Sequence, residues 1–82
     1  VICTTGIGVS ITANKIHGIR CALLSDLMSA RLTRQHNDAN MMALGAGVVG
    51  EKLALEMVDL FLTTPFEGGR HARRVDKVMA LE

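Results

Sequence analysis

Short apolar runs alternate with segments of helical spacing along the whole length of this 82-residue chain. Three of the runs have the length and composition of strands, and they lie at residues 1–3, 19–24 and 41–44. Each run leads through glycine or polar residues into a helical segment, and no long linker or repeat interrupts the series. Alternation of this kind is typical of βα units around a parallel sheet. It predicts a single α/β domain over residues 1–82.

Four segments carry apolar residues at helical spacing, and we expect helices at residues 9–16, 26–36, 51–62 and 70–81. Ser25 precedes the second segment, and its hydroxyl can cap that helix. Pro65 ends the third segment, and the pair Gly68 and Gly69 forms a flexible joint before the fourth. One domain accommodates all of these elements.

The composition predicts an aliphatic core. Hydrophobic residues make up 49% of the chain, yet there are two Phe and no Tyr or Trp. Val, Ile, Leu, Met and Ala suit helices packed on a buried sheet. A chain of 82 residues buries only about 60% of its unfolded surface, so we expect help from a partner or a further segment. Residues 1–3 resemble the end of a buried strand, and we expect a fragment whose N-terminal strands are missing.

Charge and cysteine content argue against several classes of protein. Nine basic and eight acidic residues give a net charge of +1, which disfavours nucleic-acid or membrane-surface binding through overall charge. Two cysteines are too few for a disulfide framework, and no pattern marks a metal cluster. No apolar run reaches the roughly 18 residues that a membrane helix needs, and no signal peptide is visible. We expect a soluble, cytoplasmic protein with reduced thiols.

The clearest candidate for chemistry is Cys3, at the end of the first predicted strand. It is followed by a turn that leads into a helix, Thr4-Thr5-Gly6-Ile7-Gly8. The N–H groups and dipole at a helix N-terminus stabilise anions, so this turn can lower the pKa of the thiol and hold a substrate oxyanion. Cys3 is then a candidate proton-transfer base. An equally weighted alternative makes Cys3 a small buried hydrophobe and the glycines merely a tight turn.

Polar residues farther along the chain supply further candidates. His36 lies beside Asn37 at a predicted helix end, where it could face a cleft or simply cap and solvate the helix. Arg70 and Arg74 are four residues apart, so they share a helical face and could bind a phosphate together. A solvated helix face or non-specific contact with nucleic acid explains the same two arginines.

Three other residues are assigned structural positions. We expect His17 and His71 at the surface. Cys21 lies in the second apolar run and is expected in the strand core.

Several short motifs occur together in unbroken order along the chain. They are Cys3-Thr4-Thr5-Gly6-Ile7-Gly8, Ala13-Asn14-Lys15, Gly18-Ile19-Arg20, Ser29-Ala30-Arg31-Leu32, His36-Asn37-Asp38-Ala39-Asn40 and Glu67-Gly68-Gly69-Arg70-His71. In this combination the chain closely resembles the ribose-5-phosphate isomerase B family, over essentially its whole length. The combination is far more specific than any single motif, and it favours the functional interpretations above.

The resemblance implies a Rossmann-like, three-layer α/β/α fold with a parallel sheet. It also implies aldose–ketose isomerisation of a phosphorylated sugar such as ribose 5-phosphate, without a metal or organic cofactor. In that family the residue matching Cys3 is the base that moves a proton between C1 and C2. The turn matching residues 4–8 forms the anion hole for the enediolate, and the hydroxyl matching Thr5 lies near it.

The resemblance assigns roles to the polar residues as well. The residue matching His36 assists ring opening as an acid, and the one matching Asn37 contacts substrate. The arginines matching Arg70 and Arg74 bind chiefly the phosphate end. The active site is shared across a homodimer, which can assemble further into a tetramer, so His36 and Cys3 need not act within one subunit.

Two departures from the family pattern bear on function. The family's N-terminal part, with its first strand and an Asp-His pair, has no counterpart here, so we expect no turnover from this chain alone. The family also usually carries Arg where this chain has Gly47. Related members act on galactose 6-phosphate, allose 6-phosphate or tetrulose phosphates, and the missing Arg could shift the preference among these sugars.

Two other functions remain open from the residues. In a non-catalytic phosphosugar-binding module, the turn at residues 4–8 would hold a ligand and Cys3 would be incidental. In a nucleic-acid binder with a basic tail, residues 70–74 would contact phosphates. Nothing outside residues 70–74 supports the second of these.

Overall fold

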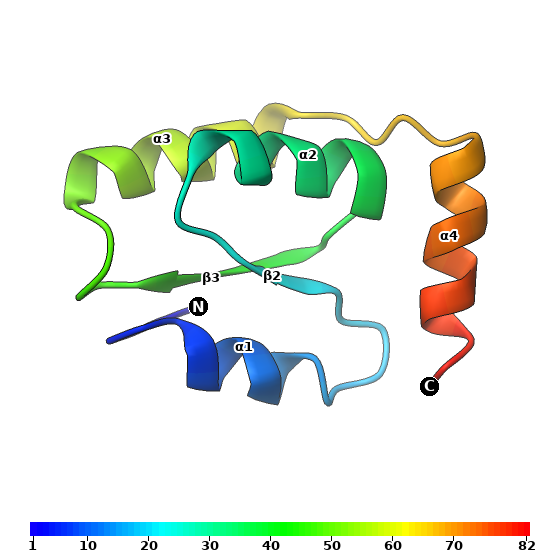
Figure 1. Ribbon diagram of the computed structural model, residues 1–82, viewed down its shortest axis with the longest axis horizontal. Coiled ribbons are helices and arrows are strands. Elements are labelled where there is room, and N and C mark those ends of the chain that lie inside the picture. The colour runs from blue at the N-terminus through cyan, green and yellow to red at the C-terminus, as the bar shows by residue number, and fades with distance from the viewer.

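The computed structural model describes all of residues 1–82 and shows three parallel strands with four helices. The elements are β1 (Ile2–Cys3), α1 (Ile7–Ala13), β2 (Cys21–Leu23), α2 (Leu27–Asn37), β3 (Met41–Gly45), α3 (Glu51–Thr63) and α4 (Arg70–Met79). Helices α2 and α3 cover one face of the sheet and α1 covers the other, which makes three layers (Figure 1). The predicted α/β/α architecture with a parallel sheet is confirmed.

The central strand is β3, since the strand order is β1-β3-β2. It pairs with β1 so that Cys3 lies opposite Gly45, and with β2 so that Cys21 lies opposite Met41. A central strand of a parallel sheet is covered on both faces, and Ala43 in β3 is accordingly fully buried. The register brings the carboxyl ends of β1 and β3 together at one edge of the molecule.

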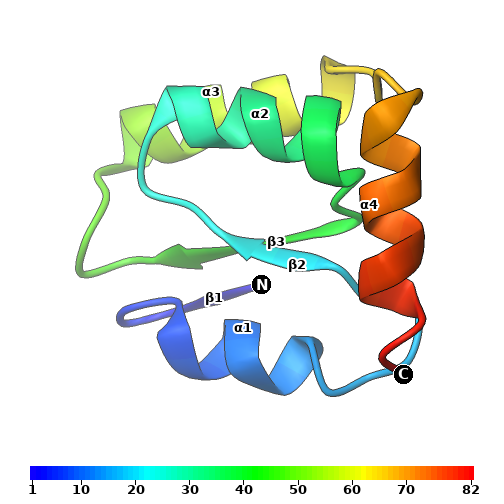
Figure 2. The same cartoon turned by 45° about the vertical axis from the view of Figure 1, so that its right-hand side comes forward.

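A small aliphatic core lies between the sheet and the α2–α3 layer, where the two helices run side by side (Figure 2). Met57 of α3 and Ala30 of α2 are fully buried and pack with Leu24 and Leu44. Burying a Met side chain completely stabilises a fold by about 1.5–3 kcal/mol. The prediction of an aliphatic core is confirmed.

Helix α4 stands across one end of the layers, beside the C-terminal end of α2 (Figures 1 and 2). Contacts at its far end tie it to the loop between α1 and β2. The Gly18 N–H donates to the Glu82 carboxylate at 2.6 Å, and the Arg20 guanidinium donates to the Met79 sulfur at 3.4 Å. None of the helices combines the length and the apolar character that a membrane crossing demands.

The first helix and second strand are shorter than predicted. Helix α1 begins at Ile7 and ends at Ala13, so residues 14–16 of the expected helix lie in a turn. The cause is the Asn14 side chain, which donates to the Cys21 carbonyl at 2.9 Å and accepts from the Cys21 N–H at 2.8 Å. The Arg20 N–H likewise donates to the Asn40 side-chain oxygen, and the strand begins at Cys21 and ends at Leu23.

The expected cap of α2 was wrong by one residue. Asp26, not Ser25, is the N-cap, and its carboxylate accepts from the Ser29 N–H at 2.7 Å. That hydrogen bond, together with the Ser29 side chain, holds the pKa of the Asp26 carboxyl below its ordinary value. The other differences are small: β3 extends to Gly45, α3 to Thr63, and α4 ends at Met79.

Candidate active site

The turn after Cys3 is fixed by close backbone packing. Gly6 has a φ of 79°, and a Cβ added there would lie 2.8 Å from the Leu44 carbonyl carbon. A Cβ on Gly45 would lie 2.5 Å from the carbonyl carbon of Thr5, so the turn rests directly on the end of β3. Only glycine fits either position without displacing backbone. The sequence Thr-Thr-Gly-Ile-Gly therefore places its amides beside Cys3 in one defined shape.

Backbone amides surround the Cys3 thiol. The Gly6 N–H donates to the Cys3 sulfur at 3.1 Å. Hydrogen bonding from the Val9 N–H is the largest influence on the thiol pKa, and the N–H groups of Gly6 and Thr5 and the Thr5 hydroxyl add to it. Together they outweigh desolvation and hold the pKa of Cys3 below its ordinary value. The thiolate is thus the favoured form at a lower pH than for a free cysteine.

The remaining residues of this turn have distinct environments. The Thr5 hydroxyl oxygen accepts from the Ile7 N–H at 3.2 Å, which leaves its own proton free for another acceptor. The Thr4 carbonyl accepts from the Gly47 N–H at 2.8 Å. Gly8 lies in the first turn of α1 and is exposed. The structure therefore brings together all six of the predicted residues from Cys3 to Gly8.

Gly47, at the position where the resemblance leads us to expect Arg, lies against the same turn. A Cβ there would lie 3.1 Å from the Thr4 carbonyl oxygen and 3.3 Å from the Thr4 methyl carbon. A larger residue would require Thr4 to shift by a few tenths of an ångström. The departure from the family pattern is thus adjacent to the candidate anion hole and not remote from it.

A second cluster forms at the C-terminal end of α2. The rings of His36 and His71 stack with their centroids 4.2 Å apart and their planes 9° from parallel. The Glu67 carboxylate oxygen lies 3.7 Å from Nε2 of His36 and 3.5 Å from Nε2 of His71. The Glu67 N–H donates to the Gln35 carbonyl at 3.1 Å, which holds this loop against the end of α2.

The expectation of a surface position for His71 was wrong. Its side chain is only 9% exposed, because it is covered by His36 and by the loop that carries Glu67. Desolvation is the main cause that lowers the pKa of His71, with the charges of His36 and Arg70 acting in the same direction and Glu67 opposing them. His17, by contrast, is exposed as predicted.

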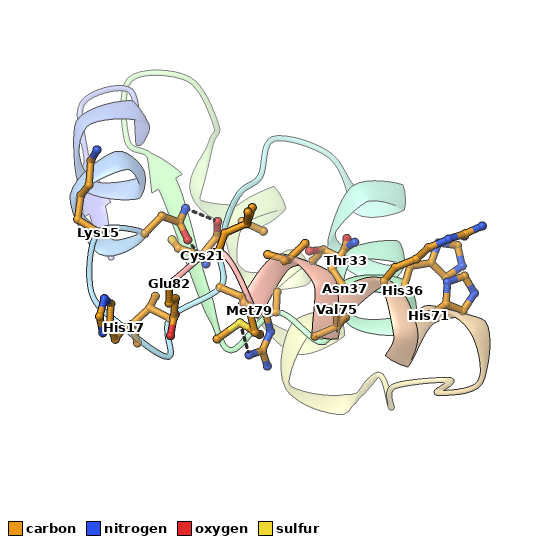
Figure 3. A pocket seen from close by; sticks show the side chains of 18 residues that line it. Lys15, His17, Cys21, Thr33, His36, Asn37, His71, Val75, Met79 and Glu82 are labelled. Carbon is orange, nitrogen blue, oxygen red and sulfur yellow. Dashed lines mark hydrogen bonds between the residues drawn. The ribbon is translucent and has the colours of Figure 1, made fainter.

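A cavity of about 900 Å³ opens between α4 and the α1–β2 loop. His36 and His71 line one end of it and Lys15 and His17 the other, as Figure 3 shows. Asn37 and Arg74 also line the cavity. Arg70 begins α4 one turn before Arg74 and is exposed. The structure therefore groups the second set of predicted residues, His36, Asn37, Arg70 and Arg74, around the start of α4 and the end of α2.

The two groups of predicted residues lie at opposite ends of β3. Cys3 is paired with Gly45, the last residue of β3, whereas α2 ends at Asn37, shortly before Met41 begins the strand. Four steps of about 3.3 Å along β3 separate the two ends by about 13 Å. Figure 1 shows the same separation, with the start of α1 at one edge of the molecule and α4 at the other. One chain does not bring His36 to Cys3.

The chain was compared with known protein families, curated proteins and solved structures. Residues 1–78 match the family described as Ribose/Galactose Isomerase. The chain belongs to this family. Among curated isomerases, a putative sugar phosphate isomerase YwlF of Bacillus subtilis is 54% identical over 81 residues, covering 99% of this chain and 54% of that protein. Ribose-5-phosphate isomerase B of Escherichia coli is 52% identical over the same proportions.

Solved structures of the isomerase family superpose closely on this chain. Ribose-5-phosphate isomerase B of Clostridium thermocellum has a TM-score of 0.96 at 54% identity, over 99% of this chain and 55% of that one. The Mycoplasma genitalium enzyme with bound ribulose-5-phosphate has a TM-score of 0.95 at 44% identity, over 98% and 53%. The chain thus spans about half the length of the isomerases that it matches. The resemblance inferred from the motifs is confirmed, and the roles of individual residues stay predictions.

Two residues of the second cluster were missed by sequence reasoning. Glu67 and His71 stand in a motif of the family resemblance, but neither was given a site role. Glu67 lies in the loop before α4, and Gly68 and Gly69 between the two residues both have positive φ. The contact between Glu67 and His71 therefore depends on the shape of this loop and not on helical spacing.

Proposed function

We propose that this chain takes part in the isomerisation of an aldose phosphate to a ketose phosphate, ribose 5-phosphate and ribulose 5-phosphate being the leading pair. Cys3 is the proton-transfer base. The observation that carries the proposal is the Cys3 thiol, whose pKa is lowered by a turn of backbone amides that can also receive a substrate oxyanion. The names of the relatives point to the same class of reaction.

The proposed chemistry is a proton transfer through an enediolate. The Cys3 thiolate removes the proton on C2, the electron pair moves into the C1–C2 bond, and the carbonyl oxygen on C1 becomes an oxyanion. The N–H groups of Gly6 and Ile7 already donate to Cys3 and Thr5. The other N–H groups of the turn at residues 4–8 and the Thr5 hydroxyl donate to that oxyanion, which makes the C2 proton acidic enough to leave. The thiol then returns a proton to C1 while a proton passes from the C2 hydroxyl to O1, and the ketose results.

The second cluster is proposed to open and hold the sugar. His36 acts as the acid for ring opening, Asn37 contacts the substrate, and Arg70 and Arg74 bind the phosphate. Arg74 lines the same cavity as His36 and Asn37, and a guanidinium is suited to a phosphate group. Every step is a proton transfer or an ionic contact that side chains and amides of the chain can perform, so the proposal invokes no cofactor.

The separation of the two clusters supports a shared site. Since one chain holds His36 and Cys3 at opposite ends of β3, a substrate that meets both needs a second copy of the chain. A two-fold dimer provides this, because each subunit then offers its Cys3 end to one site and its His36 end to the other. We therefore propose a homodimer, or a tetramer built from it, with two such sites.

The proposed function is tested by following the proton on C2 of the substrate. Ribose 5-phosphate is incubated in D2O with the chain and, where the chain is part of a longer protein, with that protein, while NMR follows exchange at C2 and the appearance of ribulose 5-phosphate. Exchange with turnover in the wild type and in Cys21→Ala, and its loss in Cys3→Ala with the fold retained, supports the proposal. Normal turnover in Cys3→Ala removes Cys3 from the role. Tight binding of sugar phosphate without exchange favours the binding module instead.

A further inference from the structure

Three side chains of the second cluster converge without bonding to one another. His36, Glu67 and His71 each offer one ligand atom, and these atoms all lie within 4.8 Å of one another. The two nitrogen–oxygen separations, 3.7 and 3.5 Å, exceed the 2.7–3.2 Å that is typical of an N–H···O hydrogen bond. The carboxylate therefore lies near both imidazoles at a distance that a direct hydrogen bond does not explain.

These separations fit a shared metal ion. Zinc binds imidazole nitrogen and carboxylate oxygen at about 2.0–2.1 Å in tetrahedral geometry, which places neighbouring ligand atoms about 3.3 Å apart. The two nitrogen–oxygen separations need to contract by only a few tenths of an ångström to reach that value, and the separation between the two imidazole nitrogens, which is at most 4.8 Å, by up to about 1.5 Å. The side chains of His36 and Glu67 are 39% and 49% exposed, so both have room to move. Because the two rings stack only 9° from parallel, the exposed His36 ring has to rotate out of the stack for its nitrogen lone pair and that of His71 to meet at one ion.

The surroundings supply an anchor and an open coordination position. The His71 side chain is nearly buried, and the Glu67 backbone is held to Gln35, so two of the three ligands stand on fixed supports. His36 and His71 line the cavity of about 900 Å³, so a fourth position is accessible to water.

We propose that His36, Glu67 and His71 form a three-ligand site for a divalent transition-metal cation of the zinc class. The two imidazoles and one carboxylate are the ligand types that such ions prefer. Arg70 and Arg74 stand nearby on α4 and repel a cation, which restricts the site to ions that bind nitrogen strongly and disfavours Mg²⁺ and Ca²⁺.

Metal binding has a consequence that rests on the proposed function. An ion on Nε2 of His36 takes the place of the proton that His36 donates in ring opening, and it also places a positive charge beside the phosphate-binding arginines. Zinc is therefore a reversible inhibitor of the isomerase reaction, and the site couples metal availability to turnover.

Binding is tested first, without reference to activity. Zn²⁺ is titrated into the protein against a chromophoric chelator, and Co²⁺ is added separately so that its visible absorption reports the ligands. We expect one ion per chain and a Co²⁺ spectrum without the thiolate charge-transfer band that binding at Cys3 or Cys21 would produce. Glu67→Gln keeps the size of the side chain and should weaken Zn²⁺ binding by at least about 10- to 100-fold.

The matched control is His17→Gln, which removes an exposed imidazole at the other end of the same cavity. Its affinity for Zn²⁺ should equal that of the wild type. The site would be overturned if Glu67→Gln bound Zn²⁺ as tightly as the wild type, or if His17→Gln lost as much affinity as Glu67→Gln. A wild type without saturable Zn²⁺ binding would overturn it as well. Circular dichroism establishes that the variants are folded, and Glu67 is exposed enough that its replacement leaves the core intact.

Inhibition of isomerisation by Zn²⁺ is tested second. A failure of inhibition can be told apart from a failure of the proposed function. Zn²⁺ should abolish isomerisation in the wild type, a chelator should restore it, and Glu67→Gln should resist the metal. Binding without inhibition retains the site and overturns the coupling to His36. An absence of isomerase activity in metal-free protein, assayed also in the longer protein where the chain is part of one, overturns the proposed function and leaves the binding result standing.

Discussion

The two ends of β3 hold their polar groups in different ways. At the carboxyl end, backbone amides surround Cys3, and Gly6 and Gly45 pack so tightly that no Cβ fits. At the amino end, side chains from α2, α4 and the loop between α3 and α4 meet at 3.5–3.7 Å, and His36 remains 39% exposed. The first end is preorganised to stabilise one charge at one place. The second can adjust, as befits a region proposed to meet a ring, a phosphate or a metal ion.

The largest expected effect is on activity, when two inactive variants, one at each end of β3, are mixed. Cys3→Ala and His36→Asn, each made in the longer protein where the chain is part of one, should reduce turnover about 10²–10⁴-fold, because each removes a proposed acid or base. Random exchange between the two makes half of the dimers mixed, and each mixed dimer regains one intact site of two. The mixture should therefore recover roughly a quarter of wild-type activity, measured as the rate of ketose phosphate formation.

The control for that experiment mixes Cys3→Ala with the double variant that lacks both Cys3 and His36. No dimer of that pair has an intact site, so activity should stay at the level of the separate variants. Absence of recovery in the first mixture, with subunit exchange verified by mass spectrometry, would mean that Cys3 and His36 do not meet across two chains.

The rigidity of the Cys3 end is tested at two glycines of like conformation. Gly6 has a φ of 79° and Gly68 a φ of 70°, but only Gly6 has atoms within 4 Å of an added Cβ. Gly68→Ala should cost about 1–2 kcal/mol of unfolding free energy from backbone strain alone. Gly6→Ala should cost about 1–3 kcal/mol more than that, since its Cβ would also lie 2.6 Å from the Leu23 side chain and 2.8 Å from the Leu44 backbone.

Denaturant unfolding with both variants measures this difference. The second glycine acts as the control, because it carries the conformational penalty without the collision. Equal losses of stability at the two positions would show that packing against β3 does not constrain the turn, and the contrast between the two ends would fail.

Local sequence patterns were sufficient for the elements of the fold but not for their exact bounds. The order of strands and helices follows from apolar periodicity, which is a property of neighbouring residues. The shorter α1 and β2 depend on Asn14 binding the backbone of Cys21, a contact that no propensity records. The cap of α2 moved from Ser25 to Asp26 because both residue types cap well and only the backbone conformation separates them.

Some features of the candidate site also follow from local sequence, and others depend on tertiary contacts. The turn at residues 4–8 is contiguous in sequence, so its grouping around Cys3 was predictable. The burial of His71 depends on where the loop after α3 meets the end of α2, and that approach is tertiary. The separation of His36 from Cys3 depends likewise on the parallel register of β1 on β3.

The thiols of Cys3 and Cys21 lie in two strands of the same sheet, and their reactivities can be compared directly. Amide hydrogen bonds lower the pKa of Cys3, whereas burial raises the pKa of Cys21. Alkylation by iodoacetamide near pH 7 should therefore be faster at Cys3, on the order of tenfold or more, because the thiolate is the reactive form. Peptide mass spectrometry over time gives both rates in one sample, and sugar phosphate should protect Cys3 alone. Equal rates would mean that the turn does not activate the thiol.

The smallest effect is expected at the other end of β3, in the pH dependence of stability. Because folding lowers the pKa of His71, the unfolded chain is protonated at this residue at a pH at which the folded chain is still neutral there. The free energy of unfolding should then fall as pH decreases from about 7 to about 5, through the ordinary histidine range. His71→Gln should flatten this dependence and the exposed His17→Gln should keep it, as measured by thermal unfolding at each pH. An unchanged slope in His71→Gln would mean that the buried, stacked imidazole does not carry the shift, and the amino end of β3 would lose its titrating group.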